Sequence, residues 1–337
     1  MEAGFPRVTV VIPTHNRWLM LRSAVWSALN QDGVGTRVVV VDDRSEDETP
    51  ERLRHAESDR LTVLRTPRTV GVSTARNIGL EHVQTEWVAF LDDDDIWAPF
   101  HLRQLTGAID AAVRAGRRID LGCSGSVAIT LDREVQQVKP APDPARVRDL
   151  LSSENALATP SRVLARTAAV RDAGGFDPSL SVVADWDLWL RLARAGGVAV
   201  SPPLSVGYTK HEDNMHLAAA TALRELPTLD ARYRRNGAGP TLTQHCSRWI
   251  ATCYRTAGNR RQAARWYLRS FRHERRVRDL ARAAGMLVGE RAIELSRLRR
   301  SSSVPPGIAP WLDCIRAIDL LPPEEVPFGG VIGCAEE

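Results

Sequence analysis

The chain has 337 residues, of which 43% are hydrophobic, 26% charged and 6% aromatic, with a formal net charge of +4. This length is sufficient for one large domain or two unequal ones, and the composition is typical of a globular protein and excludes a disordered or fibrous one. No apolar run approaches the ~20 residues that a membrane-spanning helix requires, which excludes an integral membrane protein.

The first half of the chain alternates apolar, β-branched runs with segments of helical periodicity. This alternation is typical of an α/β domain with a mostly parallel central sheet, because short, wholly apolar strands are buried on both faces. We predict strands at residues 7–12, 37–41, 61–64 and 87–91, and helices at 18–30 and 73–82.

Polar clusters follow three of these strands, at residues 13–17, 42–47 and 92–95. The carboxyl ends of parallel strands meet at one edge of a sheet, so we expect the three clusters to converge there. Four consecutive aspartates, 92–95, would repel one another without a cation, and carboxylates are the ligands that Mg²⁺ and Mn²⁺ prefer. The alternative is a solvated acidic turn that caps a helix beginning near Pro99.

The chain resembles the inverting family 2 glycosyltransferases, which have the nucleotide-sugar-binding GT-A fold. The resemblance spans roughly residues 7–215. It is carried by an ordered set of motifs at residues 8–17, 41–47, 71–79, 90–99, 174–177 and 184–191. Each motif alone is weak, and their order and separations are specific.

The resemblance implies a nucleotide site in the first two clusters, at Pro13, Thr14, His15, Arg17 and Asp43. His15 would flank the base, and Asp43 would accept a hydrogen bond from an imide N–H. Such a donor suggests uracil, although guanine and thymine offer one too. The alternative for His15 is a turn residue bonded to its own backbone, and for Asp43 it is a helix cap.

The resemblance also implies that residues 92–94 form the family's DxD motif. Asp94 would bind a divalent metal, Mn²⁺ or Mg²⁺. Asp92 and Asp93 would bind the donor, and Asp95 would support the motif or cap the helix.

Two further residues complete this expected donor site. Arg76 would clamp the diphosphate or the sugar, or would alternatively form a salt bridge to one of the aspartates. His211, from a loop over the donor, would complete the metal shell or contact a phosphate, or would alternatively be a surface histidine.

Asp185 is the residue that the resemblance places as the general base. On a helix over residues 185–195 it begins the apolar stripe of Leu188, Trp189 and Leu192, which predicts a buried carboxylate. The alternative is an N-terminal helix cap. Asp187 lies off this stripe and is predicted to be exposed. The family usually has an acid where this chain has Ala184, which weakens any inference about acceptor contacts there.

The segment from residue 232 to 300 holds eighteen arginines and four acids. We predict helices at 241–257, 260–274 and 276–299, the first two resembling a single tetratricopeptide-like hairpin. The last helix has an apolar stripe, which could lie on an anionic membrane or, more simply, pack against its neighbour. No nucleic-acid recognition module is present, so nucleic-acid binding is not expected. The stripe comprises Val277, Leu280, Ala284, Leu287, Val288, Leu295 and Leu298.

These patterns predict a GT-A domain at residues 1–225, an arginine-rich helical region at 226–300 and a loosely packed, partly disordered tail at 301–337. The N-terminus shows no signal-peptide pattern, and the five cysteines form no CxxC pair and indicate no disulfide framework. We therefore expect a cytoplasmic protein, with possible peripheral contact of the basic helices with the membrane.

The resulting hypothesis is a metal-dependent inverting transferase that moves a sugar from a nucleotide diphosphate, most simply UDP, to an acceptor hydroxyl. The acceptor could be a saccharide, a lipid-linked glycan, a peptide or a small molecule. The alternatives are a non-catalytic nucleotide-sugar-binding scaffold and a sugar nucleotidyltransferase. The latter would need a glycine-rich loop after the first strand, where this chain has residues 13–17.

Overall fold

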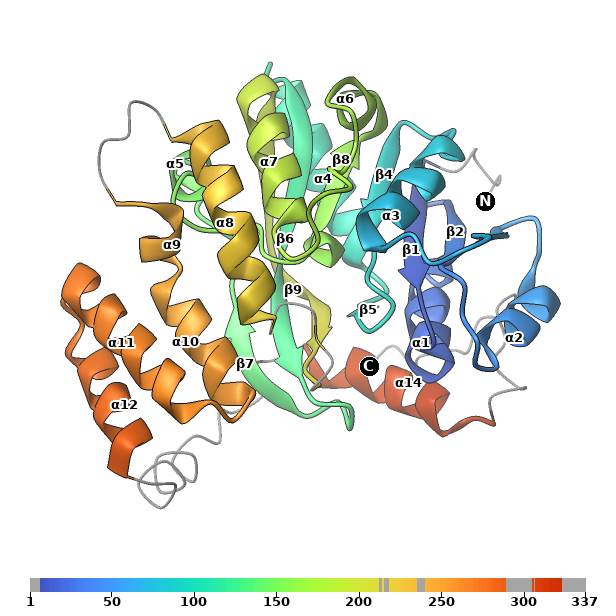
Figure 1. Cartoon of the computed structure of the whole chain (residues 1–337). Coiled ribbons are helices and arrows are strands. Elements are labelled where there is room, and N and C mark those ends of the chain that lie inside the picture. Colours follow the sequence, from blue (N-terminus) through green and yellow to red (C-terminus); the bar gives the residue numbers. More distant parts are fainter. Residues whose placement is uncertain are drawn as a thin grey trace.

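The computed structural model describes residues 7–211, 214, 218–234, 240–288, 305 and 307–322. A central sheet carries helices on both faces, and a group of helices, α9 to α12, lies at one end (Figure 1). The strands are β1 (Val8–Thr14), β2 (Thr36–Asp42), β3 (Leu61–Arg65), β4 (Trp87–Phe90), β5 (Ile96–Trp97), β6 (Ile119–Ile129), β7 (Val135–Lys139), β8 (Val163–Arg166) and β9 (Gly197–Thr209). The helices of the sheet region are α1 (Trp18–Leu29), α2 (Thr49–Ala56), α3 (Val72–Glu81), α4 (His101–Arg114), α5 (Val147–Leu151), α6 (Thr167–Asp172) and α7 (Ala184–Ala195). They are followed by α8 (Ala219–Tyr233), α9 (Leu242–His245), α10 (Ser247–Thr256), α11 (Arg260–Glu274), α12 (Val277–Val288) and α14 (Ala309–Leu320).

The sheet has the strand order β3-β2-β1-β4-β8-β6-β9-β5, with β7 paired to β6. The first four strands are parallel, as the short apolar runs predicted, and β8 is antiparallel to both of its neighbours. The predicted strands and helices of this half agree with the structure to within two residues at each end. The α/β fold class is confirmed, but the sheet as a whole is mixed and not mostly parallel, because β5 and β9, β6 and β7, and both pairings of β8 are antiparallel.

The apolar runs are buried on both faces because successive side chains of a strand point in opposite directions. Val10 and Ile12 of β1 belong to the core that includes residues of α1 and α4, whereas Val11 belongs to the core that includes residues of α3 and α7. Burying each such side chain stabilises the fold by about 1.5–3 kcal/mol. β1 is thereby held at the centre of the sheet, with its carboxyl end at the site described below.

The segment at residues 174–177 is attached to α3 by one side chain. Asn77 donates to the carbonyl oxygen of Phe176 at 2.8 Å and accepts from its backbone N–H at 2.8 Å. Gly175 has φ +69° here, and a Cβ atom at this position would lie 2.5 Å from the side-chain oxygen of Asn77. Glycine is therefore required where the two segments meet.

The arginine-rich region is helical, and the helix at 260–274 has the predicted bounds. The predicted stripe of α12 is not its packed face, however. Leu280 and Leu287 are 42% and 68% exposed, whereas Ala283 and Met286 are buried. The interpretation that the stripe packs against a neighbouring helix is therefore wrong within the described residues. The part of the stripe formed by the side chains of Val288, Leu295 and Leu298 lies outside those residues.

The expectation of a loosely packed tail is wrong for residues 309–320, which form α14. Trp311, Leu312 and Ile315 are buried against Trp26 and the ends of β5 and β6. Arg22 of α1 donates to the carbonyl oxygens of Asp319 and Leu321, which anchors the end of the helix. Residues 323–337 lie outside the described part of the chain, so the rest of that expectation is untested, as is the division into three domains.

Two further sequence expectations concern the cysteines and the membrane. Cys123, Cys246 and Cys253 are buried and form no disulfide, whereas Cys314 is disulfide-bonded, which its spacing did not indicate. None of the helices in the described parts of the chain has the length and apolar character that crossing a bilayer requires.

Candidate active site

The three polar clusters meet at the carboxyl edge of the parallel strands, as predicted. The hydroxyl of Thr14, at the end of β1, donates to Asp93 at 2.7 Å. The guanidinium of Arg17 donates to Asp93 and to Asp94, each at 3.1 Å. Pro13 lies next to Thr14 inside β1, opposite Val41 of β2. The loop after β1 is therefore joined directly to the aspartate run after β4.

Three of the four consecutive aspartates turn toward a common point. Asp92, Asp94 and Asp95 each offer one carboxylate oxygen, and these oxygens lie within 4.8 Å of one another. Asp93 is not part of this group, because it faces Thr14 and Arg17. Asp95 does not cap α4, which has no side-chain cap; it accepts instead from the backbone N–H of Thr209 at 3.1 Å. The helix-cap alternative for Asp95 is therefore wrong.

His211 lies beside this group. Its Nε2 atom is 2.9 Å from Asp94 Oδ2, and the side-chain amide of Asn214 donates to the same oxygen at 3.3 Å. The histidine side chain is only 6% exposed. His211 is thus a buried neighbour of the aspartates, and the surface-histidine alternative is wrong.

Arg76, on α3, pairs with Asp92 at 2.5 Å, and its guanidinium lies over the ring of Phe176 at 5.1 Å. The salt bridge that we considered as an alternative is therefore present. A second partner of Asp92 was not anticipated from sequence. The hydroxyl of Thr159 donates to Asp92 at 3.1 Å and lies 3.2 Å from Asp95.

His15 and Asp43 are adjacent at the ends of β1 and β2. The Nδ1 atom of His15 is 2.7 Å from the carbonyl oxygen of Asp43, so the ring is fixed to the neighbouring strand end and not to its own backbone. The Asp43 carboxylate accepts from the hydroxyl of Thr66 and from the backbone N–H groups of Val70 and Gly71. This carboxylate orders the loop that leads into α3 and caps no helix.

Burial raises the pKa values of several of these carboxyls. Burial and the nearby charge of Asp94 raise the pKa of Asp93 to about 7, although Arg17 opposes the shift. Burial, with the charges of Asp94 and Asp92, raises the pKa of Asp95 well above its ordinary value. Such buried, like-charged carboxyls are stabilised by a cation, which makes this donor set a good fit to a divalent metal.

Asp185 begins α7 on its buried face, as the stripe predicted, and is 9% exposed. One carboxylate oxygen accepts from the side-chain amide of Asn155 at 2.9 Å and the other from the backbone N–H of Trp186 at 2.7 Å. Burial raises its pKa to about 6, against the lowering effect of these two bonds, and the charges of Arg76 and Asp92 also act on it. The base candidate therefore belongs to the same site as the aspartate cluster.

The expectation that Asp187 is exposed is wrong: it is 1% exposed. Its carboxylate binds Arg191 at 2.7 Å, Arg232 at 3.1 Å and the hydroxyl of Tyr233 at 2.7 Å. The helical stripe did not reveal this, because the burial comes from α8, which is remote in sequence.

Three residues of the site were missed from sequence. Asn155 and Thr159 lie in a stretch whose motifs are sparse. Glu225 accepts from the backbone N–H groups of residues 181–183 and so fixes the segment that leads into α7. No local signal marks these three, because each acts on a residue 30 or more positions away.

Comparisons with known proteins agree with this geometry. Residues 9–125 match the model of glycosyl transferase family 2. The pre-mycofactocin glycosyltransferase of Mycobacterium tuberculosis is 31% identical over 223 residues, which is 62% of this chain and 43% of that protein. The chain spans less than half the length of the first curated relatives that it matches.

Solved structures share the fold. S. aureus TarS in complex with UDP-GlcNAc is similar with a TM-score of 0.52 and 20% identity, over 93% of this chain and 88% of that one. The mannosyltransferase PcManGT of Pyrobaculum calidifontis, in complex with GDP-Man and Mn²⁺, has a TM-score of 0.50 and 20% identity, over 96% and 83% of the two chains. The match over residues 9–125, these relatives and the shared fold support a family 2 glycosyltransferase domain with the GT-A fold.

Proposed function

We propose that this protein is a metal-dependent inverting glycosyltransferase that transfers a sugar from a nucleotide diphosphate, with UDP as the first donor to test, to an acceptor hydroxyl. The observation that carries the proposal is the single site formed by a three-aspartate group and the buried carboxylate of Asp185. Arg76 joins the two parts, because it pairs with Asp92 and its charge also acts on Asp185.

Asp185 is the proposed base. An acceptor hydroxyl must lose its proton as it attacks the sugar carbon, and a general base with a pKa somewhat below the working pH is well matched to that step. With a pKa of about 6, Asp185 is mostly ionised at neutral pH. Asn155 and the Trp186 N–H orient its carboxylate while leaving further lone pairs for the acceptor proton.

Asp92, Asp94 and Asp95 would hold the divalent metal, with His211 against Asp94. When bound, such an ion offsets the negative charge that develops on the leaving diphosphate. The nearby cations Arg17 and Arg76 form salt bridges with Asp94 and Asp92, respectively. From these positions their guanidinium groups can also reach phosphate oxygens.

The nucleotide side of the site consists of Thr14, His15 and Asp43. A carboxylate has about four lone-pair positions, and Asp43 uses three of them to order the loop at residues 66–71. One position on Oδ2 remains for the imide N–H of a base. The exposed ring of His15, fixed by the Asp43 carbonyl, would flank that base.

The first test is calorimetric titration of the protein with UDP, with and without Mn²⁺, on wild type, Asp94→Ala and the exposed control Asp132→Asn. We expect metal-dependent binding that Asp94→Ala weakens by at least about tenfold and that the control keeps. A folded wild type that binds UDP under neither condition would overturn the UDP assignment, and the titration would then be repeated with GDP and dTDP.

The second test separates a transferase from a scaffold. Asp185→Asn should keep UDP binding and lower the release of UDP from UDP-sugars, with a supplied acceptor or water, by about 10²–10⁴-fold. A wild type that binds UDP-sugars but turns over none of them with any acceptor would support the scaffold. Formation of UDP-sugar from UTP and a sugar phosphate would instead support the nucleotidyltransferase.

A further inference from the structure

Helices α10, α11 and α12 form a helical arm whose negative charges are already neutralised. Within residues 240–288 the only acids are Glu274 and Asp279. Arg248 binds both, at 2.5 and 2.9 Å, and Arg276 and Arg282 bind one each. The remaining arginines of the arm therefore contribute uncompensated positive charge.

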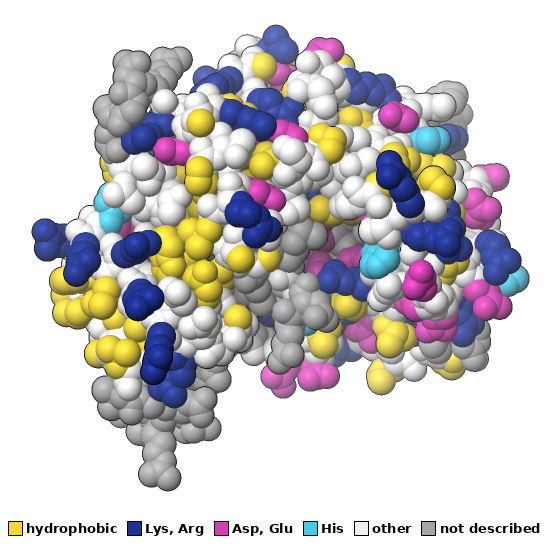
Figure 2. Space-filling view, in the orientation of Figure 1, with side chains coloured by type: hydrophobic (Ala, Val, Ile, Leu, Met, Phe, Trp, Pro, Cys, Tyr) yellow, Lys and Arg dark blue, Asp and Glu magenta, His cyan; other side chains and the backbone are white. Residues whose placement is uncertain are grey.

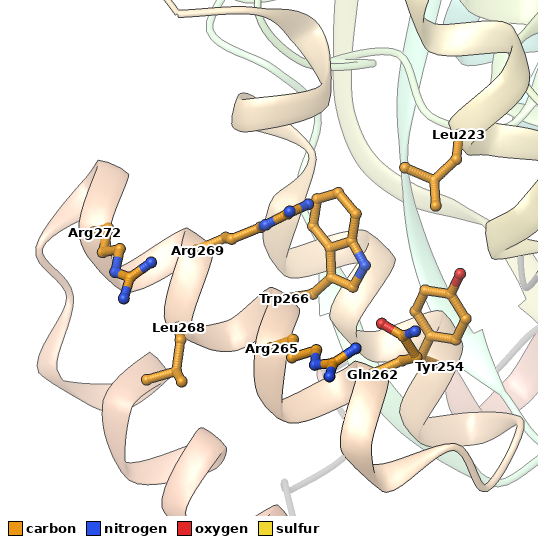
Figure 3. A pocket seen from close by; sticks show the side chains of 8 residues that line it. All are labelled: Leu223, Tyr254, Gln262, Arg265, Trp266, Leu268, Arg269 and Arg272. Carbon is orange, nitrogen blue, oxygen red and sulfur yellow. The ribbon is translucent and has the colours of Figure 1, made fainter.

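Three of those arginines lie along one face of α11. Arg265, Arg269 and Arg272 follow one another at spacings of four and three residues, which places them on the same side of a helix. All three are exposed and line an open pocket of about 430 Å³ between α8, α10 and α11, which Figure 3 shows from close by. Arg269 lies over the ring of Trp266 at 4.5 Å.

A second pocket of about 370 Å³ shares Trp266, Arg269 and Arg272 with the first. No acidic residue lines either pocket among the described residues. The two pockets together thus form a cationic cleft of a size and charge suited to phosphate groups.

The same arm exposes large apolar side chains. Val277, Leu280 and Leu287 of α12 are 73%, 42% and 68% exposed and fall on one face of the helix. Figure 2 shows hydrophobic side chains interleaved with Lys and Arg side chains over this part of the molecule. Exposed leucines next to arginines are unfavourable in water but suit an interface that is apolar on one side and anionic on the other.

We propose that the helical arm binds the surface of anionic lipid membranes. The lipid phosphates bind to the three arginines of α11, Arg265, Arg269 and Arg272. The apolar side chains of α12 enter the boundary between headgroups and acyl chains. A nucleic acid would contact the arginines and Trp266 but would gain nothing from the exposed side chains of Leu280 and Leu287. A membrane would contact both the arginines and these leucines, so membrane binding explains more of the exposed features. The proposal goes beyond the proposed transferase function and does not depend on it.

The test is co-sedimentation of the full chain with vesicles of phosphatidylcholine alone or with added phosphatidylglycerol. We expect binding to the anionic vesicles that falls as salt rises. The triple variant R265Q/R269Q/R272Q should bind roughly 100-fold more weakly, at about fivefold for each arginine near an anionic surface. The variant L280S/L287S should also bind more weakly and, unlike wild type, should lose its residual binding at high salt.

The matched control is R37Q/R103Q/R114Q, which removes the same charge from exposed arginines outside the arm. It should keep vesicle binding, and the far-UV circular dichroism spectrum of each variant reports whether it is folded, independently of vesicles and of nucleotide binding. The proposal is overturned if wild type ignores anionic vesicles, or if the control loses as much binding as the α11 triple. It is also overturned if L280S/L287S binds like wild type, or if a single-stranded oligonucleotide of matched phosphate concentration displaces the protein from the vesicles.

Discussion

Asn155 donates a hydrogen bond of 2.9 Å to the carboxylate of Asp185, across 30 residues of sequence. The same amide group also donates to the carbonyl oxygen of Ala158, and its oxygen accepts from the Ala158 N–H, so the side chain is fixed at both ends. Asn155 therefore orients the proposed base and lowers its pKa, against the raising effect of burial.

This relationship predicts the pH dependence of turnover. Asp185 can accept a proton only when ionised, so the rate should rise with pH through about 6 and level off above it. In Asn155→Ala the lost hydrogen bond raises the pKa of Asp185, so the midpoint should move to higher pH. The profile of kcat/KM against pH measures this. Ser152→Ala, in the same loop, is the control. A rate that falls equally at every pH, with an unchanged midpoint, would contradict the effect of Asn155 on the pKa of Asp185.

His211→Ala should weaken Mn²⁺ binding about 10–100-fold, because His211 contacts Asp94 from a segment after β9. The measurement is calorimetric titration of the protein with Mn²⁺. His55→Ala, an exposed histidine on α2, is the matched control and should bind the ion as wild type does. Equal affinities in the two variants would remove His211 from the metal site.

Asp187→Ala should lower the free energy of unfolding by about 2 kcal/mol. This is less than the ~3–5 kcal/mol typical of breaking a fully buried pair, because Arg191 and Arg232 are partly exposed and can be hydrated. Tyr233→Phe, which removes one neutral donor to Asp187, should cost about 1 kcal/mol. Urea denaturation checks both values. A loss of turnover without loss of stability would instead assign Asp187 to the chemistry.

Ile315→Ala should destabilise the protein by about 2–5 kcal/mol, because Ile315 of α14 is fully buried against the core near α1. Leu320→Ala, in the same helix but 85% exposed, should change stability by less than about 0.5 kcal/mol. Equal, small effects in urea denaturation would show that α14 is not part of the folded core.

The motifs at residues 8–17, 41–47 and 90–99 allowed much of the site to be predicted, because each includes the end of a strand. The run of β-branched residues in β1 determines a buried strand, and a parallel sheet brings the ends of β1, β2 and β4 to one edge. The meeting of Thr14, Arg17 and Asp93 follows from that geometry. The spacing of Leu188, Trp189 and Leu192 likewise predicted that Asp185 is buried.

The tertiary structure decided the remaining features, because they depend on segments that are distant in sequence. Helical periodicity treats a helix as having one buried face, but α7 packs on the core with one face and on α8 with another, which buries Asp187. Asp95, and not Asp93, belongs to the three-aspartate group because of the turn after β4 and the contacts of Asp95 with Thr159 and Thr209. The packing of α14 on α1 similarly depends on a hydrophobic surface that forms only when the two ends of the chain meet. Sequence periodicity thus determined which residues are buried by their own element, whereas burial and contacts supplied by a distant element required the assembled fold.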